Sequence, residues 1–494
     1  MKKTIKSLVG CVVFVALVLY LLSGVTEVLT PKFENRYYIL EDYLEKNPEE
    51  NLHDIQVFGS CHAYTSFNPA YMEEAYGVSG FVYANAGEII PTTYARMVEQ
   101  FQKHTPKVAL VEIWGINPYE TYSAQEDVFG HYLSNNLEQV GSSLAKQEVI
   151  LDFQEKEFQD ISLLNMNFPF MNYKDRALDG SLTKLDFDYD FLETQEYMLP
   201  YTYKEMLSRR KNSGYAPFSS VIIEGYPQKQ NTIAPGEMVE IEPDIAEYIQ
   251  KIIDLCKEKN VELIFYRSPY ISTVNELKKL NHLEQICEQN EVLFIDLEAE
   301  IQYDYKVDFR DYEHLSEVGA NKSTEFLMPY IMEAMGQTWT KKEITRSNLL
   351  TNSDCSNTEG WKSRFDALSM TETGIRAEAT IPAAGWLIYQ DIPATDDFWG
   401  MSVTGSFSIT DYAGEYIAPV VSYRDADNNE IDRDKIEIVD GKCTVAGLVP
   451  VGTEFFRVGV YAWEDTECGD FVVADKIELF QGAFTADKLP TVIN

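Results

Sequence analysis

The chain has 494 residues, of which 79 are acidic and 41 basic, so its formal net charge is −38 at pH 7. A surface this acidic repels the phosphates of nucleic acids, which excludes nucleic-acid binding as a main role and predicts no nucleic-acid partner. The seven cysteines are scattered and form no CxxC pair, so the sequence predicts neither a disulfide scaffold nor a zinc cluster, and we expect no metal and no cofactor. The length allows two or three domains.

Residues 1–28 are predicted to form a cytoplasmic stub and a transmembrane anchor. Lysines near the N-terminus precede an uncharged apolar run from Leu8 to Val25, which is about long enough to cross a bilayer as one helix. A cleaved signal peptide is the alternative, but no small-x-small cleavage site follows the run. Because basic residues precede the span, we expect a single-pass protein of the cell membrane with its N-terminus in the cytoplasm and its catalytic domain extracellular. The lipid bilayer is then one of its partners.

Residues 29–344 are predicted to form an α/β domain. Short apolar runs of the kind that form buried strands lie at Ile55 to Phe58, Gly80 to Ala84, Val108 to Trp114, Val261 to Arg267 and Val292 to Leu297. Amphipathic helical stretches lie at Thr92 to His104, Pro243 to Lys259, Val274 to Asn290 and Glu317 to Met335. This alternation predicts a parallel sheet covered by helices on both faces. The interval from about 119 to 242 breaks the alternation, and we interpret it as an insertion at one end of the sheet.

Residues 345–494 are predicted to form a β-sandwich, because helical periodicity disappears and short alternating runs recur between turn residues. The runs include "GWLIYQDI", "MSVTGSFSI", "APVVSYRD", "FFRVGVYAW" and "FVVADKIELF". Aromatic residues that could stack on sugars are Trp361, Trp386, Tyr389, Trp399, Tyr412, Tyr416, Tyr461 and Trp463. Most aromatic side chains in a sandwich belong to its core, so this pattern alone does not predict sugar binding.

The stretch "VFGSCHAY" holds a hydroxyl, a thiol and an imidazole at consecutive positions, Ser60, Cys61 and His62. In a parallel α/β sheet the reactive groups collect at the carboxyl ends of the strands. Ser60 follows Gly59 just past the first strand, where a tight turn can present its hydroxyl as a nucleophile; the alternative is an ordinary helix cap. We expect Cys61 to pack inward, and we assign His62 a possible contact with substrate.

A proton acceptor for Ser60 is predicted far along the chain. The segment "DFRDYEHLSEVGANK" places Asp311 three residues before His314, after the last predicted strand. A neutral imidazole can accept the serine proton, and a nearby carboxylate fixes its tautomer and stabilises the imidazolium. Acyl chemistry also needs donors for an oxyanion. Gly87 follows the second strand and Asn117 follows the third, so both are candidate donors.

In this order, "FGSCH", Gly87, the Gly-x-Asn at 115–117 and the Asp-x-x-His at 311–314 resemble the four blocks of the SGNH/GDSL hydrolase superfamily. The resemblance implies a flavodoxin-like three-layer fold with Ser60 as nucleophile, His314 as base and Asp311 as orienting acid. It also implies an oxyanion hole made by the N–H groups of Ser60 and Gly87 and the amide of Asn117. Two departures are that Phe-Gly-Ser replaces the usual Gly-Asp-Ser, and that Pro118 stands where an Asp commonly follows the Asn.

These departures and the insertion resemble the membrane-anchored branch of the superfamily, which includes proteins of D-alanyl transfer to teichoic acids and of alginate-type O-acetylation. The segments "NLLTNSDCSNTEGW" and "ADKIELFQG" resemble jelly-roll carbohydrate-binding modules. We therefore expect an extracytoplasmic serine esterase that removes acyl groups, most naturally acetyl, from a cell-envelope polysaccharide. The alternatives are an O-acyltransferase of a cell-wall glycan that works with a membrane acyl-donor protein, and a non-catalytic glycan-binding surface protein.

Overall fold

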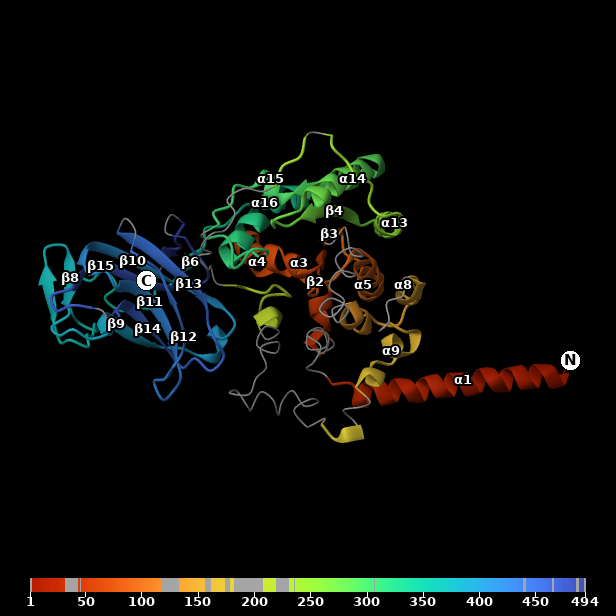
Figure 1. The fold of residues 1–494 in the computed structure, drawn as a ribbon, viewed down its shortest axis with the longest axis horizontal. Helices are drawn as coiled ribbons and strands as arrows, with labels where there is room; N and C mark the ends of the chain where they lie inside the picture. The colour runs from red at the N-terminus through yellow and green to blue at the C-terminus, as the bar shows by residue number, and fades with distance from the viewer. Residues whose placement is uncertain are drawn as a thin grey trace.

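The computed structural model describes residues 2–31, 43–44, 46–114, 116, 133–155, 161–173, 178–181, 208–218, 231–234, 236–305, 307–438, 441–463, 466–485 and 488–492. Helix α1 (Lys2–Leu29) projects from the rest of the chain (Figure 1). Its segment Leu8–Thr26 is exposed, long and apolar enough to be either a membrane span or a signal sequence.

A five-stranded parallel sheet forms the centre of the α/β region. Its strands are β1 (Ile55–Gly59), β2 (Phe81–Ala84), β3 (Val108–Glu112), β4 (Glu262–Arg267) and β5 (Leu293–Asp296). The strand order is β2-β1-β3-β4-β5, and every neighbouring pair is parallel. The five predicted strands are therefore confirmed, each within two residues of its predicted bounds.

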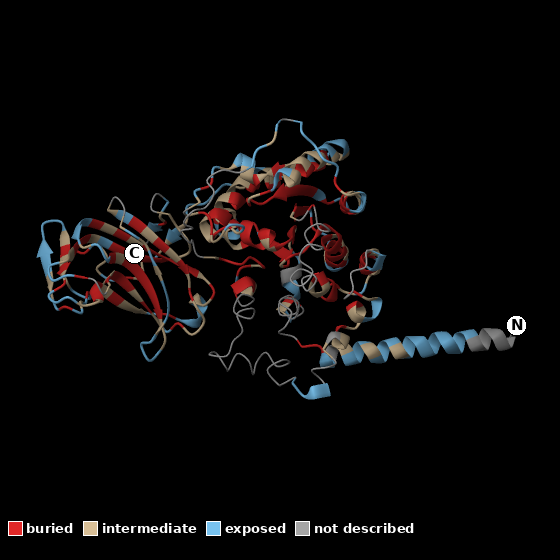
Figure 2. Ribbon diagram, in the orientation of Figure 1, coloured by how far each residue is buried: buried red, intermediate tan, exposed pale blue. Residues whose placement is uncertain are grey.

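Helices cover both faces of this sheet, because successive side chains of a strand point to opposite faces. Phe58 packs in a core with α5 (Ile90–Lys103), α13 (Pro243–Lys259) and α14 (Val274–Asn290). Its neighbour Val57 packs in a second core on the other face. The helices on that face are α3 (Cys61–Ser66), α4 (Pro69–Tyr76) and α16 (Glu317–Met335), and the short α15 (Leu297–Glu300) follows β5. The predicted helices are confirmed, and both faces of the sheet are buried (Figure 2).

Between β3 and α13 lies the predicted insertion, of which the structure describes only parts. These parts form α8 (Leu144–Glu155), α9 (Leu163–Asn167) and the 3₁₀ turn η2 (Pro169–Asn172). Val149 and Phe153 of α8 pack into the same core as α5. Another 3₁₀ turn, η1 (Pro48–Asn51), precedes β1.

The C-terminal β region contains two antiparallel sheets that share one core. One sheet has the order β13-β10-β15-β8-β7 and the other β12-β11-β14-β9. The strands are β7 (Leu368–Thr371), β8 (Gly374–Glu378), β9 (Gly385–Pro393), β10 (Ser402–Ala413), β11 (Ile417–Arg424), β12 (Glu430–Lys435), β13 (Lys442–Leu448), β14 (Phe455–Ala462) and β15 (Phe471–Gln481), with the 3₁₀ turn η5 (Asp396–Phe398). The prediction of an all-β, antiparallel C-terminal region is confirmed.

The two regions contact each other directly. The Ser208 hydroxyl donates to the carbonyl of Gly400 at 2.7 Å, and Nζ of Lys211 donates to the carbonyls of Asp396 and Trp399 at 2.8 and 2.9 Å. A small parallel pair joins β6 (Thr345–Arg346) to β16 (Thr491–Val492). The C-terminal strand therefore returns to the junction between the α/β and β regions.

Candidate active site

The site lies at the carboxyl end of the parallel sheet, where Gly59 of β1 meets Glu112 of β3. Gly59 has a φ of 135°, and a Cβ on it would lie 2.8 Å from Cβ of Glu112. Only glycine adopts this backbone readily and leaves room for the neighbouring side chain. The carboxylate of Glu112 can therefore lie against the turn, and its Oε2 accepts the Ser60 N–H at 3.3 Å.

Ser60 is fully buried at this turn. Its hydroxyl donates to Oε2 of Glu112 at 2.8 Å and accepts the backbone N–H of His62 at 3.1 Å. Ser60 is thus the N-cap of α3, the role that the sequence left open as an alternative. Its backbone N–H also donates to Glu112, and the place of this N–H in an oxyanion hole stays a prediction.

Asp311 and His314 meet in one tight turn before α16, as their spacing predicts. Oδ1 of Asp311 accepts the backbone N–H groups of Glu313 and His314 at 2.9 and 2.8 Å. The ring Nδ1 of His314 lies 2.9 and 3.0 Å from the two oxygens of the same carboxylate. Because Nδ1 faces Asp311, Nε2 is the nitrogen left for a reacting group.

The described hydrogen bonds of the Ser60 hydroxyl are with Glu112 and His62, while Sγ of Cys61 lies 3.9 Å from Nδ1 of the His62 ring, which stacks on the ring of His314. Cys61 is partly exposed, whereas Ser60 is buried. The hydrogen bond expected between His314 and Ser60 is not among those of the described residues, where the Ser60 side chain caps the first turn of α3 and bonds to Glu112. The inward packing expected of Cys61 stays a prediction.

The charges around Cys61 favour a thiolate and imidazolium pair. Burial opposes ionisation of the thiol, but the charge of His62 and hydrogen bonds from His314 and His62 hold the Cys61 pKa well below its ordinary value. Burial lowers the His314 pKa, but the bonds to Asp311 and Cys61 raise it overall to about 10. Although burial opposes it, the bond from His314 lowers the Asp311 pKa to about 2. A depressed thiol pKa of this kind is typical of reactive cysteines.

His62 is buried beside this pair. Its ring stacks on that of His314, with centroids 5.1 Å apart and an interplanar angle of 18°, and it also contacts Trp114 and Tyr270. Its Nδ1 lies 3.2 Å from Oγ of Ser60 and 3.9 Å from Sγ of Cys61. The ring of His62 therefore lies within the site, and its contact with substrate stays a prediction.

Of the other expected oxyanion donors, Gly87 is buried in the turn after β2 with a φ of 63°. Asn117 and Gly115 lie outside the described residues. Glu112 was not predicted as a site residue. Burial, partly offset by the charge of His62 and the bonds from Ser60, raises its pKa to about 7. In the sequence, Glu112 is marked only by being an acidic residue at the end of the apolar run "VALVE".

Within the described ranges, no three His, Cys, Asp or Glu side chains are grouped as ligands for a metal ion. The described side chains of the site supply a hydroxyl, a thiol, two imidazoles and two carboxylates.

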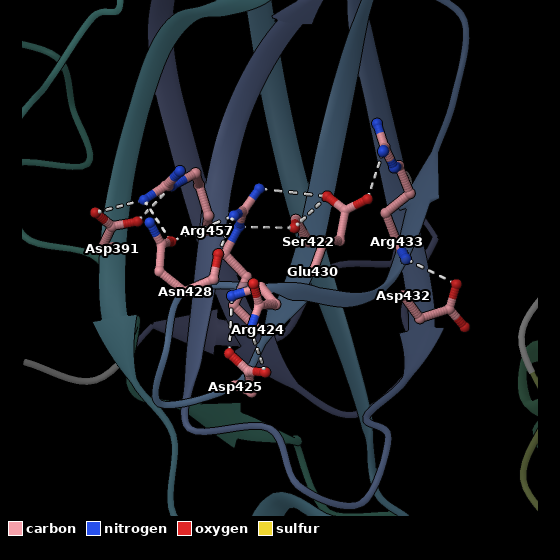
Figure 3. Close-up of polar contacts among 10 residues, drawn as sticks. Asp391, Ser422, Arg424, Asp425, Asn428, Glu430, Asp432, Arg433 and Arg457 are labelled. Carbon is pink, nitrogen blue, oxygen red and sulfur yellow. Dashed lines mark hydrogen bonds and ion pairs between the residues drawn. The ribbon is translucent and has the colours of Figure 1, made fainter.

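On the β region, the four-stranded sheet carries a network of charged side chains (Figure 3). Arg457 bonds to Asp391 at 2.6 and 3.2 Å and lies over the Tyr389 ring, 4.5 Å from its centroid. Arg424 bonds to Ser422 at 3.2 Å. Among the aromatic residues named from the sequence, Trp361 and Trp386 are buried, whereas Tyr412 and Tyr416 are exposed.

No protein-family model matches this sequence, and no curated protein matches it. Among solved structures, the chain is similar to a protein from Bacteroides fragilis that is provisionally described as an acylhydrolase, at 10% identity and a TM-score of 0.28, over 60% of this chain and 96% of that one. It is also similar to the CBM22-1 xylan-binding domain of Xyn10C from Paenibacillus barcinonensis, at 13% identity and a TM-score of 0.22, over 29% of this chain and 100% of that one. A family 29 carbohydrate-binding module matches at 15% identity and a TM-score of 0.21, over 30% of this chain and 98% of that one. Likenesses this distant leave the family open.

Proposed function

We propose that the α/β region is an acyl-transfer enzyme in which Cys61 is the nucleophile, His314 the acid and base, and Asp311 the group that orients His314. The observation that carries this proposal is that Sγ of Cys61 lies beside the two stacked imidazoles of His62 and His314, of which His314 is held by Asp311, while the Ser60 hydroxyl bonds to Glu112. The nucleophile expected from the sequence therefore moves by one residue, from the hydroxyl to the thiol.

In the first step, the sulfur of Cys61 attacks the carbonyl carbon of an acyl ester. The C–O bond to the alcohol breaks, and the alcohol leaves with the proton that His314 donates. In the second step, water or a sugar hydroxyl attacks the thioester while His314 takes its proton, and the Cys61 sulfur leaves. We assign the oxyanion to the backbone N–H of Cys61, with Gly87 and Asn117 as further donors, in place of the Ser60 N–H.

We also propose that the α/β region belongs to the SGNH class. The strand order β2-β1-β3-β4-β5 is that of flavodoxin-like sheets, and the site lies at their carboxyl ends. With Cys61 as nucleophile, Gly59-Ser60-Cys61 takes the place of the Gly-Asp-Ser of the superfamily. The departure from the pattern is then the nucleophile itself, sulfur for oxygen.

We propose an acyl ester of a cell-envelope polysaccharide, with acetyl as the acyl group, as the substrate. If α1 is an uncleaved anchor with its N-terminus in the cytoplasm, it holds the site outside the membrane and near the envelope. The β region is then a jelly-roll module that holds the polysaccharide. This assignment of substrate rests on architecture rather than on the reacting groups.

Transfer to a glycan hydroxyl, with acyl groups supplied by a membrane partner, is the second candidate. The thiol favours it, because a thioester intermediate retains more of the energy of an activated acyl group than an oxygen ester does. A non-catalytic glycan-binding protein is the third candidate, and a reactive Cys61 paired with His314 argues against it.

The test uses the full chain in detergent micelles with a chromogenic acetyl ester. We expect turnover by the native protein and by Ser60→Thr, with loss of turnover in Cys61→Ala and His314→Ala. Acid quench and peptide mass spectrometry should find the acetyl group on Cys61. Turnover that persists in Cys61→Ala would refute the assignment, and an added oligosaccharide that accepts acetyl faster than water does would identify a transferase.

A further inference from the structure

Glu112, Ser60 and His62 form a continuous chain of hydrogen bonds beside the proposed nucleophile. A serine hydroxyl has one proton to donate and two lone pairs that accept. Ser60 gives its proton to Oε2 of Glu112, at 2.8 Å, and one lone pair accepts the backbone N–H of His62, at 3.1 Å. The ring Nδ1 of His62, at 3.2 Å, can bond to this oxygen only as a donor. The chain therefore fixes a proton on Nδ1 of His62.

That proton lies next to the reacting sulfur. Nδ1 of His62 is 3.9 Å from Sγ of Cys61, so its N–H is shared between the Ser60 oxygen and the sulfur. The other ring nitrogen, Nε2, is buried and has no hydrogen-bond partner among the described residues. His62 thus stands in one tautomer, with its donor directed toward Ser60 and Cys61.

We propose that Glu112 and Ser60 are positioning residues that hold the His62 imidazole with its Nδ1 proton toward Cys61, so that His62 is a second donor to the sulfur beside His314. The two imidazoles are each held by a carboxylate, His314 directly by Asp311 and His62 through the hydroxyl of Ser60. This inference rests on the proposed function, because a second donor matters only if the sulfur reacts.

The shared proton suits a sulfur whose charge changes during a reaction. When the sulfur is a thiolate, the Nδ1–H of His62 stabilises its charge. When the sulfur is acylated and neutral, the same N–H stays bonded to the Ser60 oxygen, so no buried donor is left without a partner. A donor that could bond only to the sulfur would instead be buried without a hydrogen-bond partner in the acyl-enzyme, which costs free energy.

Other titratable groups also face this cluster and must be counted in its pH dependence. The groups are His62 and Cys61 on α3, Glu112 on β3, Tyr266 on β4, Tyr270 after β4, and Asp311 and His314 before α16. Of these, Glu112 reaches His62 only through Ser60 in the described hydrogen bonds. Changes at Ser60 or Glu112 therefore test the chain without removing either imidazole.

The experiment measures the rate at which iodoacetamide alkylates Cys61 in the full chain as a function of pH, with the modified peptide quantified by mass spectrometry. The variants are Ser60→Ala and Glu112→Gln, with Ser60→Thr as the conservative variant. Ser66→Ala is the matched control, because Ser66 is another buried serine of α3 and bonds to Ser268 instead, at 2.7 Å.

We expect Ser60→Ala to raise the alkylation midpoint by on the order of one pH unit, which makes alkylation about tenfold slower below the midpoint. Ser60→Thr and Ser66→Ala should keep the native midpoint, and so should Glu112→Gln, because its side-chain oxygen can still accept the Ser60 hydroxyl. An unchanged midpoint in Ser60→Ala would overturn the proposal. Failure of the proposed function has a different signature, since Cys61→Ala would then retain ester turnover whatever the alkylation midpoints are.

Discussion

Nδ1 of His314 lies 2.9 Å from Oδ1 of Asp311, and the same oxygen accepts the His314 backbone N–H at 2.8 Å. Oδ1 of Asp311 thus fixes both the His314 ring and the turn that carries it. Nε2 of His314 is left to face the site, and the negative charge of Asp311 stabilises the imidazolium.

Asp311→Asn should preserve the turn, because the asparagine side-chain oxygen can accept the same backbone N–H groups. It removes the negative charge that holds the His314 proton, and we expect kcat for the acetyl ester to fall by on the order of 10²–10⁴. The His314 pKa, now about 10, should fall as well. Glu313→Gln is the matched control, since its exposed side chain lies in the same turn and its kcat should stay near native. An Asp311→Asn variant with native kcat would contradict this role.

The pH dependence of kcat/KM should follow the thiolate and imidazolium pair. The Cys61 pKa is depressed, so the thiolate forms well below the ordinary range of a thiol. The His314 pKa is raised, so the proton that protonates the leaving alcohol is lost only near pH 10. We expect kcat/KM to rise once at acidic pH, stay level through neutrality, and fall on the alkaline side.

Cys61→Ser should reverse the direction in which kcat/KM changes at alkaline pH. A serine hydroxyl stays neutral and needs a neutral imidazole as its base, and without the thiolate the His314 pKa should fall. The residual activity of Cys61→Ser should therefore rise with pH where that of the native enzyme falls. Parallel profiles for the two proteins, measured with the same chromogenic ester, would show that the native enzyme does not use the pair.

The parts of this architecture that could be predicted are those that depend on periodicity. Strands β1, β2 and β3 are buried along their whole length, and burial on both faces makes their apolar runs visible in the sequence. Asp311 and His314 were paired because a three-residue spacing fits within one turn. These signals are local, so they need no knowledge of what packs against them.

The proposed nucleophile depends instead on a shift of one residue at the start of α3. Ser60 could either cap the helix or face the cleft, and the choice is made by Glu112, which comes from another strand. Glu112 itself is a single acidic residue at a strand end, and the sequence does not show that Gly59 lets it reach the turn. Contacts between strands therefore decide the assignment that the local pattern left open.

The raised pKa of Glu112 should make the free energy of unfolding depend on pH between 4.5, its ordinary pKa, and about 7, its pKa in the folded protein. In this window the unfolded chain has released the proton and the folded chain keeps it, so the free energy of unfolding falls with increasing pH. Glu112→Gln has no proton to release. Its stability relative to the native protein should therefore increase over this window, by up to about 3 kcal/mol.

Urea unfolding of both proteins at a series of pH values measures this difference. Glu262→Gln is the control, because Glu262 is exposed at the start of β4, and its stability relative to native should vary little with pH. A difference between Glu112→Gln and the native protein that is constant across the window would show that Glu112 is already ionised when folded at low pH.

Gly319 fixes the position of the His314 turn against α16. A Cβ on Gly319 would lie 2.2 Å from the backbone oxygen of Asp308, and that oxygen accepts the Ser316 N–H at 2.9 Å. Gly319→Ala must push the loop outward, which we expect to destabilise the fold by about 1–3 kcal/mol. Because His314 moves with the loop, kcat should fall by on the order of 10²-fold.

Gly336→Ala is the control, because a Cβ on Gly336 would meet nothing within 4 Å and its φ is +61°. This variant should lose about 1 kcal/mol of stability and keep native kcat. A Gly319→Ala variant that loses stability but retains kcat would show that the turn holds His314 in place independently of α16.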